Sequence, residues 1–243
     1  MRKFYQTNWQ DMEFSDVASV SSRELAGPAF YDAFYRALFA KYDGFDALDP
    51  DWRQKKDELA DWIADELPDG AKVLSVGCGL GYMEQRICRQ HGRRIDLHVQ
   101  DYASDALRWL RSVMPSENIH DITDGGGAGA YDMIYLSAVD YALDDRALHE
   151  LLRQLKTSLK PGGRVLMVSA SFLDETTVER VVHSVKDLAR WGLEQIGLYE
   201  KQFWGWMRTR DDYHRVMRSA GFAGVADGWV KTENQQTFWI KGQ

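Results

Sequence analysis

The chain has 243 residues, which suits one α/β domain with a full hydrophobic core. Its 30 basic and 37 acidic residues give a formal net charge of −7, which disfavours nucleic acid as the main partner because a phosphate backbone attracts basic surfaces. The two cysteines, Cys78 and Cys88, form neither a disulfide framework nor a metal cluster and are typical of a reducing compartment. No apolar signal region opens the chain and no stretch reaches the roughly eighteen apolar residues of a membrane span, so we expect a soluble, cytoplasmic protein.

The first 52 residues are rich in aromatic side chains and predict a helical cap. Pro28 suits the first turn of a helix, and apolar residues recur at helical spacing after it, so a helix is expected over residues 28–42. A second helix is expected over residues 51–67, where an apolar stripe again repeats. The turn at residues 68–70 separates this helix from the first strand of the core.

Three glycines at alternate positions, Gly77, Gly79 and Gly81, follow an apolar stretch at residues 73–76 and precede a helical pattern that begins at Tyr82. They therefore lie in the turn between a strand and a helix. Glycine there allows positive φ angles and lets a ligand approach the main chain closely. The free N–H groups and partial positive charge of the helix N-terminus suit a carboxylate or phosphate.

Asp101 lies twenty residues beyond the last of these glycines, at the end of the next expected strand, residues 94–101. An acid in that place can accept hydrogen bonds from both hydroxyls of a ribose, so these features describe a nucleoside-containing ligand on an open α/β sheet. The dinucleotide fingerprint Gly-x-Gly-x-x-Gly needs its third glycine where this chain has Tyr82. The spacing here is instead Gly-x-Gly-x-Gly.

The rest of the chain alternates strands with helices, which predicts parallel pairing with right-handed crossovers. Strands are expected at residues 118–122, 131–137, 164–170, 225–231 and 236–241, and helices after Ser104, over 144–159 and from Thr209 to Gly221. The last two strands are expected to form a closing hairpin. A mostly helical insertion is expected over residues 173–208, after the fifth strand.

Five segments in the right order resemble the class I S-adenosylmethionine-dependent methyltransferase family. They are the glycine loop, Asp101, the strand at Tyr131–Ser137, the Pro-Gly-Gly turn and strand at Ser158–Leu166, and the end of the last helix at Ser219–Phe222. The resemblance implies a Rossmann-like, seven-stranded, mostly parallel sheet with helices on both faces and an antiparallel final strand. It also implies one domain with a cap at 1–52, a core at 53–172 and 209–243, and the insertion at 173–208.

The resemblance further implies that S-adenosylmethionine is the cofactor. The residues that match cofactor positions are Gly77, Cys78, Gly79 and Gly81 beneath the methionine and ribose, Asp101 at the ribose hydroxyls, Tyr102 on one face of the adenine, Asp121 and Ile122 at the adenine amino group and edge, Ser137 at the methionine amino group, and Tyr42 over the methionine end. Each position also has an ordinary alternative, such as a helix cap for a strand-end acid or core packing for a tyrosine.

One position departs from the family pattern. The family commonly has an acid two residues before the first glycine, where a carboxylate helps to neutralise the ammonium group of the cofactor, and this chain has Ser75 there. The lack of a carboxylate at position 75 puts the affinity for the cofactor in question. The pair Tyr42-Asp43 resembles one that many relatives fold over the methionine end, and Tyr42 is the candidate for compensation.

The sulfonium of the cofactor is a strong electrophile, so the protein must mainly align the acceptor with the methyl group and exclude water. A general base is needed only where the acceptor must lose a proton. Tyr141 and Asp140 lie on the loop expected to face the methyl group and are the candidate catalytic residues. His120, His183 and His214 are alternatives, although a lone histidine more often has a structural role.

The loop after the fourth strand also disfavours several chemistries. It lacks the proline-rich turn with which relatives methylate exocyclic base nitrogens. Neither cysteine lies where a C5-pyrimidine nucleophile is expected. No clear acidic triad follows the strand, although Asp140, Asp144 and Asp145 are nearby, and no metal is therefore predicted.

The expected insertion carries many aromatic residues, and four arginines follow them closely: Arg208, Arg210, Arg215 and Arg218. Trp204, Trp206 and Arg208 are the candidate substrate-binding residues. An aromatic lid with arginines suits a planar or sugar-like acceptor with a carboxylate or phosphate; a packed lid with solvated arginines is the alternative. We expect methyl transfer to oxygen or nitrogen of a small-molecule acceptor. Methylation of protein or RNA, and cofactor binding without transfer, stay open. The sequence identifies neither the acceptor nor the oligomeric state.

Overall fold

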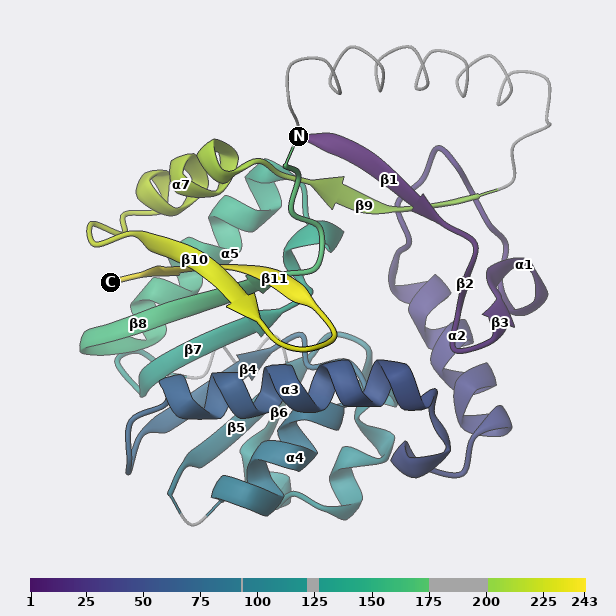
Figure 1. The fold of residues 1–243 in the computed structure, drawn as a ribbon, viewed down its shortest axis with the longest axis horizontal. Helices are drawn as coiled ribbons and strands as arrows, with labels where there is room; N and C mark the ends of the chain where they lie inside the picture. Colours follow the sequence, from purple (N-terminus) through teal and green to yellow (C-terminus); the bar gives the residue numbers. More distant parts are fainter. Residues whose placement is uncertain (93, 122–126, 175–200) are drawn as a thin grey trace.

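The computed structural model describes residues 1–92, 94–121, 127–174 and 201–243, and its centre is a seven-stranded sheet (Figure 1). The strand order is β10-β11-β8-β7-β4-β5-β6. The strands are β4 (Lys72–Val76), β5 (Asp96–Asp101), β6 (Ile119–Asp121), β7 (Tyr131–Ser137), β8 (Leu159–Ser169), β10 (Ala226–Lys231) and β11 (Gln236–Gly242). The expected Rossmann-like sheet is confirmed.

The direction of the strands places a crevice at one end of the sheet. All neighbours from β8 to β6 are parallel, whereas β11 runs antiparallel to both β8 and β10. The strand order reverses at β4, which lies between β7 and β5. Ligands of open α/β sheets bind outside the carboxyl ends of the strands at such a reversal.

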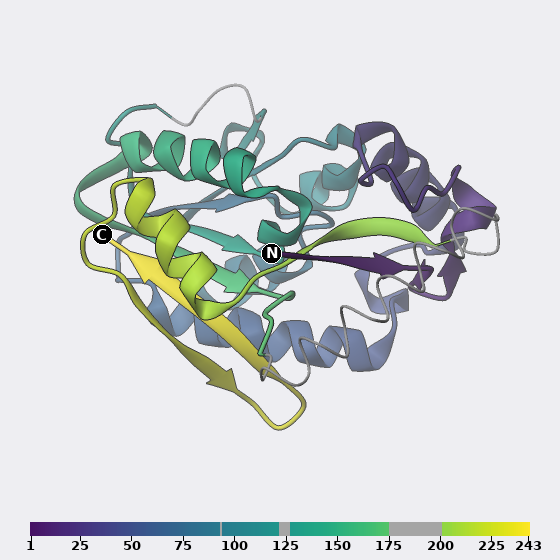
Figure 2. The same cartoon turned by 90° about the horizontal axis from the view of Figure 1, so that it is seen from above.

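Helices cover both faces of the sheet (Figure 2). One face carries α3 (Pro50–Glu66) and α4 (Tyr82–His91), and the other carries α5 (Asp145–Ser158) and α7 (Arg210–Ser219). Each helix buries one apolar stripe against the strands, as Leu148, Leu152 and Leu155 do in α5. None of the described helices combines the length and apolar character needed to cross a membrane.

The region after β5 differs from the single helix that was expected there. It forms two 3-10 helices, Ser104–Arg108 and Leu110–Ser112. Leu110 packs so closely against Gly81 that a methyl group on the glycine would lie 2.6 Å from Leu110 Cδ2. We infer that the tighter 3-10 turns follow from this packing against the glycine loop.

The N-terminal region is only partly helical. Its elements are β1 (Arg2–Gln6), β2 (Asn8–Trp9), β3 (Met12–Glu13), the one-turn α1 (Phe14–Val17) and the expected helix α2 (Pro28–Lys41). A cluster of aromatic rings joins them: Phe14 meets Phe30 and Phe34 edge to face, with centroids 5.2 and 5.7 Å apart. The same cluster contains Leu80 and Ala103, so the cap packs against the glycine loop and the turn after β5.

The expectation of a helical insertion is wrong for its last residues. Gln202–Met207 form a strand, β9, that pairs antiparallel with β1 (Figure 1). Aromatic residues pack well on a pleated surface, so this segment favours a strand once a partner strand is available. Residues 175–200 of the expected insertion lie outside the described part of the chain.

Asp212 holds the first turn of α7. Its carboxylate accepts hydrogen bonds from the N–H (3.1 Å) and the hydroxyl (2.9 Å) of Thr209 and pairs with Arg215. Burial opposes ionisation, but these hydrogen bonds outweigh it and lower the pKa of Asp212 to about 2.

We expect Asp212→Asn to lower the free energy of unfolding by about 2 kcal/mol at pH 7. A carboxylate with a lowered pKa stabilises the fold above its unfolded pKa of about 4, and this stabilisation is lost as the pH falls through about 2. The deficit of the variant should therefore shrink in urea unfolding from pH 7 towards pH 3. Asp211→Asn, in the same helical turn, is the control, and a deficit independent of pH would contradict the assignment.

Candidate active site

A cavity of about 630 Å³ lies at the carboxyl ends of the central strands, between the sheet and the N-terminal cap. Much of its wall is aromatic, with Trp9, Tyr31, Phe34, Tyr35, Trp52, Tyr82, Tyr102, Tyr141 and Trp204. Its charged residues are the acids Glu84 and Asp101 and the base Lys56. The volume falls within the range of small-molecule and cofactor sites.

The glycine loop borders this cavity with its main chain. Gly77, Gly79 and Gly81 have φ angles of 69°, 56° and 74°, a region that residues with a side chain rarely adopt. A methyl group on Gly77 would lie 2.5 Å from Val139 Cγ2, so the loop after β7 also requires glycine there. Gly77 and Gly79 line the cavity, whereas Gly81 begins α4 as its N-cap and lies outside the wall.

Asp101 ties the loop to the end of β5. Its Oδ2 accepts a hydrogen bond from the Gly79 N–H (2.7 Å) and its Oδ1 accepts one from the Ala103 N–H (2.9 Å). The side chain is buried and lines the cavity, and burial raises the pKa of its carboxyl group while the N–H donors partly offset that rise. The carboxylate lines the cavity as an acceptor at the end of β5, where a ribose hydroxyl is able to reach it.

Three other predicted cofactor residues, Tyr102, Cys78 and Ser137, lie around the same space. Tyr102, which is 40% exposed, lines the cavity next to Tyr31, with ring centroids 5.8 Å apart. Cys78 and Ser137 also line it, and burial raises the pKa of the Cys78 thiol, which keeps that thiol protonated. Asp121 ends β6 in register with Asp101 on β5. The predicted contact Ile122 lies outside the described residues.

Tyr42 lies away from the cavity wall. Its hydroxyl donates a hydrogen bond to the Gln10 carbonyl oxygen (2.9 Å), and Lys41 Nζ lies 5.1 Å from its ring centroid. Tyr35 and Tyr31, about two and three turns earlier on α2, line the cavity instead. A methyl group on Gly79 would lie 3.1 Å from the Tyr35 hydroxyl, so Tyr35 is the α2 tyrosine that reaches the glycine loop.

Asp140 does not face the cavity, which argues against its predicted catalytic role. It is fully buried, and its Oδ2 accepts hydrogen bonds from the hydroxyls of Ser169 (2.8 Å), Ser171 (3.2 Å) and Tyr213 (2.5 Å). Burial raises the pKa of this carboxyl group, and the hydroxyl donors and Arg208 partly offset that rise. The residue therefore joins β8 to α7.

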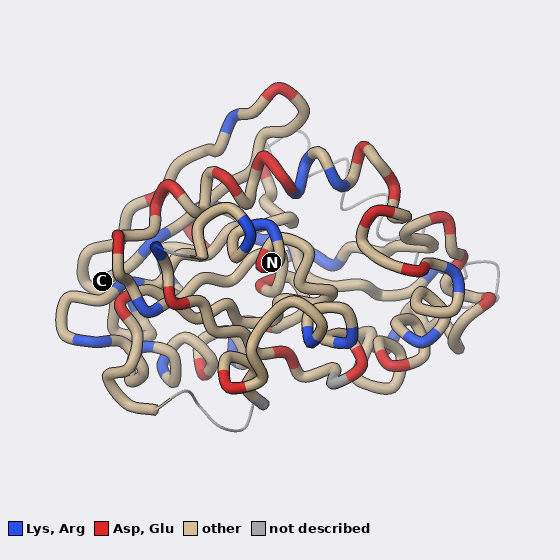
Figure 3. Tube along the Cα trace, turned by 90° about the horizontal axis from the view of Figure 1, so that it is seen from below, with Lys and Arg blue, Asp and Glu red and all other residues tan. Residues whose placement is uncertain are grey.

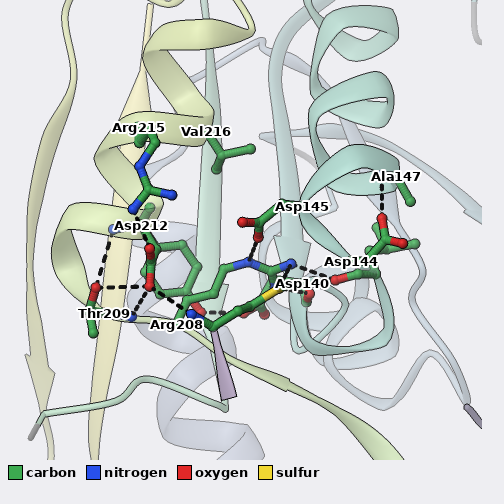
Figure 4. Close-up of polar contacts among 12 residues, drawn as sticks. Asp140, Asp144, Asp145, Ala147, Arg208, Thr209, Asp212, Arg215 and Val216 are labelled. Carbon is green, nitrogen blue, oxygen red and sulfur yellow. Dashed lines mark hydrogen bonds and ion pairs between the residues drawn. The ribbon is translucent and has the colours of Figure 1, made fainter. Parts of the chain in front are cut away.

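Arg208 is also buried rather than presented to a substrate (Figure 4). It has no exposed surface, and its guanidinium bonds Asp145 Oδ1 (2.9 Å) and the carbonyl oxygens of Asp140 and Leu143 (both 2.6 Å). Three planar donors matched to three acceptors suit a structural arginine. Arg208 was predicted to contact the substrate; in the structure it instead stabilises the loop between β7 and α5.

Tyr141 is the candidate catalytic residue that does line the cavity. Its ring packs against Phe4 (5.6 Å) and Trp204 (6.1 Å between centroids). Burial raises the pKa of Tyr141 to about 12. Its hydroxyl is therefore protonated near neutral pH, where it can donate a hydrogen bond but does not act as a tyrosinate base.

Trp204 and Trp206 were expected to act together, but a bulge separates them. Phe4 faces Gly205 and Tyr5 faces Phe203, so Trp204 has no partner in β1. Trp204 lines the cavity and stacks on Phe14 with centroids 4.7 Å apart.

Trp206 lies outside the cavity wall and packs on Phe203, with centroids 4.9 Å apart. Lys3 lies over both rings, 4.5 Å from the centroid of Phe203 and 5.6 Å from that of Trp206. Gly205 between the two tryptophans allows β9 to touch the loop after β7, because a methyl group there would lie 2.3 Å from the Tyr141 carbonyl oxygen.

Two cavity residues, Glu84 and Lys56, were not predicted. Ser75 donates a hydrogen bond to Glu84 Oε1 (2.7 Å), and the Tyr135 hydroxyl donates another to the same oxygen (2.7 Å). The signal in the sequence was an acid next to Met83 on the buried face of α4. Within the described residues, no group of three or more His, Cys, Asp or Glu side chains could hold a metal ion.

The mostly parallel sheet has an antiparallel strand, β11, and carries the glycine loop and Asp101 at the carboxyl ends of its strands. This combination is the one expected of a class I S-adenosylmethionine-dependent methyltransferase. A family profile described as a methyltransferase domain matches residues 36–227. The chain therefore belongs to the methyltransferase domain family, within the class I S-adenosylmethionine-dependent group. The glycine loop and the buried Asp101 carboxylate fit this cofactor at the carboxyl end of the sheet.

The curated relatives are similar over part of their length. Ribosomal RNA small subunit methyltransferase C of Pasteurella multocida is 30% identical over 115 residues, which cover 44% of this chain and 34% of that protein. The S-adenosyl-L-methionine-dependent Diels-Alderase iccD of Talaromyces variabilis is 29% identical over 134 residues, or 50% of this chain and 43% of that protein. The chain thus spans less than half the length of either relative.

Solved structures confirm the fold. Magnesium protoporphyrin IX methyltransferase (ChlM) of Synechocystis PCC 6803, solved with bound SAH, superposes with a TM-score of 0.56. The match covers 88% of this chain and 95% of that one at 13% sequence identity, a level at which the likeness concerns the fold alone.

We expect Asp101→Ala to weaken binding of S-adenosylhomocysteine by about 1.5–3 kcal/mol, because a charged hydrogen-bond acceptor is removed from the site. Isothermal titration calorimetry measures the change, and Asp105→Ala, on the following turn, is the control. Equal affinity of wild type and Asp101→Ala would remove Asp101 from the cofactor site.

We expect Arg208→Met to lower the free energy of unfolding by about 3–5 kcal/mol, because it leaves buried acceptors without a donor. Arg210→Met is the matched control, since the half-exposed Arg210 pairs with Asp227 at 3.2 Å and should matter by about 1 kcal/mol or less. Urea unfolding measures both. A stable Arg208→Met variant with weakened acceptor binding would restore the predicted substrate contact.

Proposed function

We propose that this protein transfers a methyl group from S-adenosylmethionine to oxygen or nitrogen of a small-molecule acceptor with a planar, apolar reacting end. The observation that carries the proposal is the aromatic cavity that adjoins the glycine loop. Trp204 from β9, Tyr141 from the loop after β7 and Tyr31 from α2 line this one space. Flat aromatic walls favour a flat acceptor and exclude water around it.

The distribution of charge supports a small acceptor without a required acidic group. Lys56 is the one basic side chain among the described residues that line the cavity. Three of the four arginines that suggested a carboxylate or phosphate (Arg208, Arg210, Arg215 and Arg218) are held in ion pairs: Arg208 with Asp145, Arg210 with Asp227 and Arg215 with Asp212. The acidic or phosphorylated acceptor considered from the sequence therefore loses its main support.

The surface gives little support for a nucleic-acid acceptor. Lys and Arg are interspersed with Asp and Glu along the described trace (Figure 3), and the net charge of the whole chain is −7. A groove that tracks a phosphate backbone needs a concentration of basic residues. One curated relative is nevertheless a ribosomal RNA methyltransferase by name, so RNA belongs among the tested acceptors.

The proposed methyl transfer depends on how the acceptor is positioned rather than on a strong base. S-adenosylmethionine supplies an electrophilic methyl group when bound. The Tyr141 hydroxyl, protonated near neutral pH, would orient the acceptor by a hydrogen bond. Trp204 would hold the acceptor's plane against the aromatic wall, and the closed packing of β9 on the loop after β7 would keep water out.

An acceptor screen tests the proposal. It would combine aromatic phenols and amines, folded RNA and protein with labelled S-adenosylmethionine. Turnover on small planar acceptors supports the proposal, whereas turnover on macromolecules alone, or cofactor binding without any turnover, contradicts it.

With an acceptor in hand, we expect Trp204→Leu to lower kcat/KM by about 10- to 100-fold, because the acceptor loses its flat support next to the reacting group. Affinity for S-adenosylhomocysteine should not change. Trp206→Leu is the matched control, since this ring lies two residues away on the outer side of β9 and should leave turnover unaltered. Equal effects of the two variants would place the acceptor elsewhere.

A further inference from the structure

One end of the cavity carries a buried carboxylate that the protein satisfies only in part. Glu84, in the first turn of α4, is 2% exposed and lines the cavity. Its Oε1 accepts the hydroxyl hydrogens of Ser75 and Tyr135, which are register partners on β4 and β7. No described residue donates a hydrogen bond to its other oxygen, Oε2. Two strands thus fix the carboxylate and leave one oxygen available.

The same cavity carries a cation in a similar condition. Lys56, on α3, lines the wall together with Glu84. Within the described part of the chain, no carboxylate lies within 4.0 Å of its Nζ and no acceptor bonds it. The Lys56 Nζ atom lies over the ring of Trp52, 5.9 Å from the ring centroid. Burial lowers the pKa of Lys56, and the charge of Glu84 opposes that effect.

These two groups are not a closed structural ion pair. Glu84 is buried and Lys56 is partly buried, and neither has a direct partner of opposite charge, a condition that is unfavourable for the protein alone. Burial raises the pKa of Glu84, although its hydroxyl donors and the Lys56 charge partly offset that rise. A ligand with an ammonium and a carboxylate close together would satisfy both groups at once.

We propose that Glu84 and Lys56 recognise the amino-acid end of S-adenosylmethionine, with Glu84 Oε2 accepting from its α-ammonium group and Lys56 Nζ donating to its α-carboxylate. Asp101, on the other strand that flanks β4, remains for the nucleoside end. The two ends of the cofactor are then held from two different edges of the glycine loop. The carboxylate that β4 itself lacks at Ser75 is supplied from α4.

The test separates the amino-acid end of the ligand from the nucleoside. Calorimetry would compare S-adenosylhomocysteine, which has the amino-acid end but no sulfonium charge, with 5′-methylthioadenosine, which lacks that end. We expect Glu84→Gln and Lys56→Met each to weaken S-adenosylhomocysteine by about 10- to 100-fold while leaving 5′-methylthioadenosine unchanged. Glu58→Gln and Lys55→Met, close by on α3, are the matched controls.

A des-amino analogue of S-adenosylhomocysteine assigns the two charges separately. Glu84→Gln should not alter the affinity of this analogue, whereas Lys56→Met should still weaken it. Thermal unfolding without ligand checks that each variant is folded; Glu84→Asp replaces an unfolded Glu84→Gln, and Lys56→Gln replaces an unfolded Lys56→Met. Equal loss for both nucleosides, or no loss for S-adenosylhomocysteine, would overturn the proposal.

Discussion

The candidate site depends on the main-chain conformation of residues 77–81. Three other parts of the molecule lie so close to this segment that side chains in place of its glycines would crowd them. Val139 occupies the space where a Cβ of Gly77 would lie, Leu110 does the same at Gly81, and the Tyr35 hydroxyl is close to that position at Gly79. The loop after β7, the turn after β5 and the helix α2 are thus all set against one five-residue segment. The glycines of that segment have left-handed backbone conformations, so the segment can contact all three parts at once and fix their positions around the cavity.

Buried charge is handled in two contrasting ways on the two faces of the sheet. On the α5 and α7 face, Arg208 satisfies carbonyls and a carboxylate within the protein, so the network closes on itself. On the α3 and α4 face, Glu84 and Lys56 line a cavity and are not completed by the described residues. The first arrangement stabilises a loop, and the second retains binding capacity at the expense of stability.

Much of the core could be predicted because its signals are local. The apolar runs at β4 and β7, the glycine spacing and the caps of α5 and α7 each lie within a few residues, and the structure has these elements close to the expected bounds. The pairing of β1 with β9 joins Arg2 to Met207, and no local pattern indicates a contact over that separation. An aromatic run without its partner strand does not distinguish strand from helix.

Side-chain roles were harder to predict than elements. An arginine is usually exposed, so only the tertiary acceptors around Arg208 reveal that it is buried. Trp204 and Trp206 were both expected to contact the acceptor, but with the bulge in β9 only Trp204 lines the cavity. Glu84 was detectable in principle as a charge within an apolar helix face, yet its hydrogen bonds come from two strands.

Leu173 and Arg208, far apart in the sequence, meet through their main chains and so close a loop in the connectivity of the chain. The Leu173 N–H donates to the Arg208 carbonyl oxygen (2.8 Å), and the Arg208 N–H donates to the Ser171 carbonyl oxygen (3.3 Å). These contacts form the base of the loop, and the Arg208 side chain stabilises it by a hydrogen bond to the Asp140 carbonyl oxygen. The entropy of closing such a loop grows only with the logarithm of its length. A change in the number of residues between Leu173 and β9 is therefore expected to cost little free energy as long as these main-chain contacts are kept. The base therefore sets only where this part of the chain leaves and rejoins the core, beside the clustered contacts of Arg208.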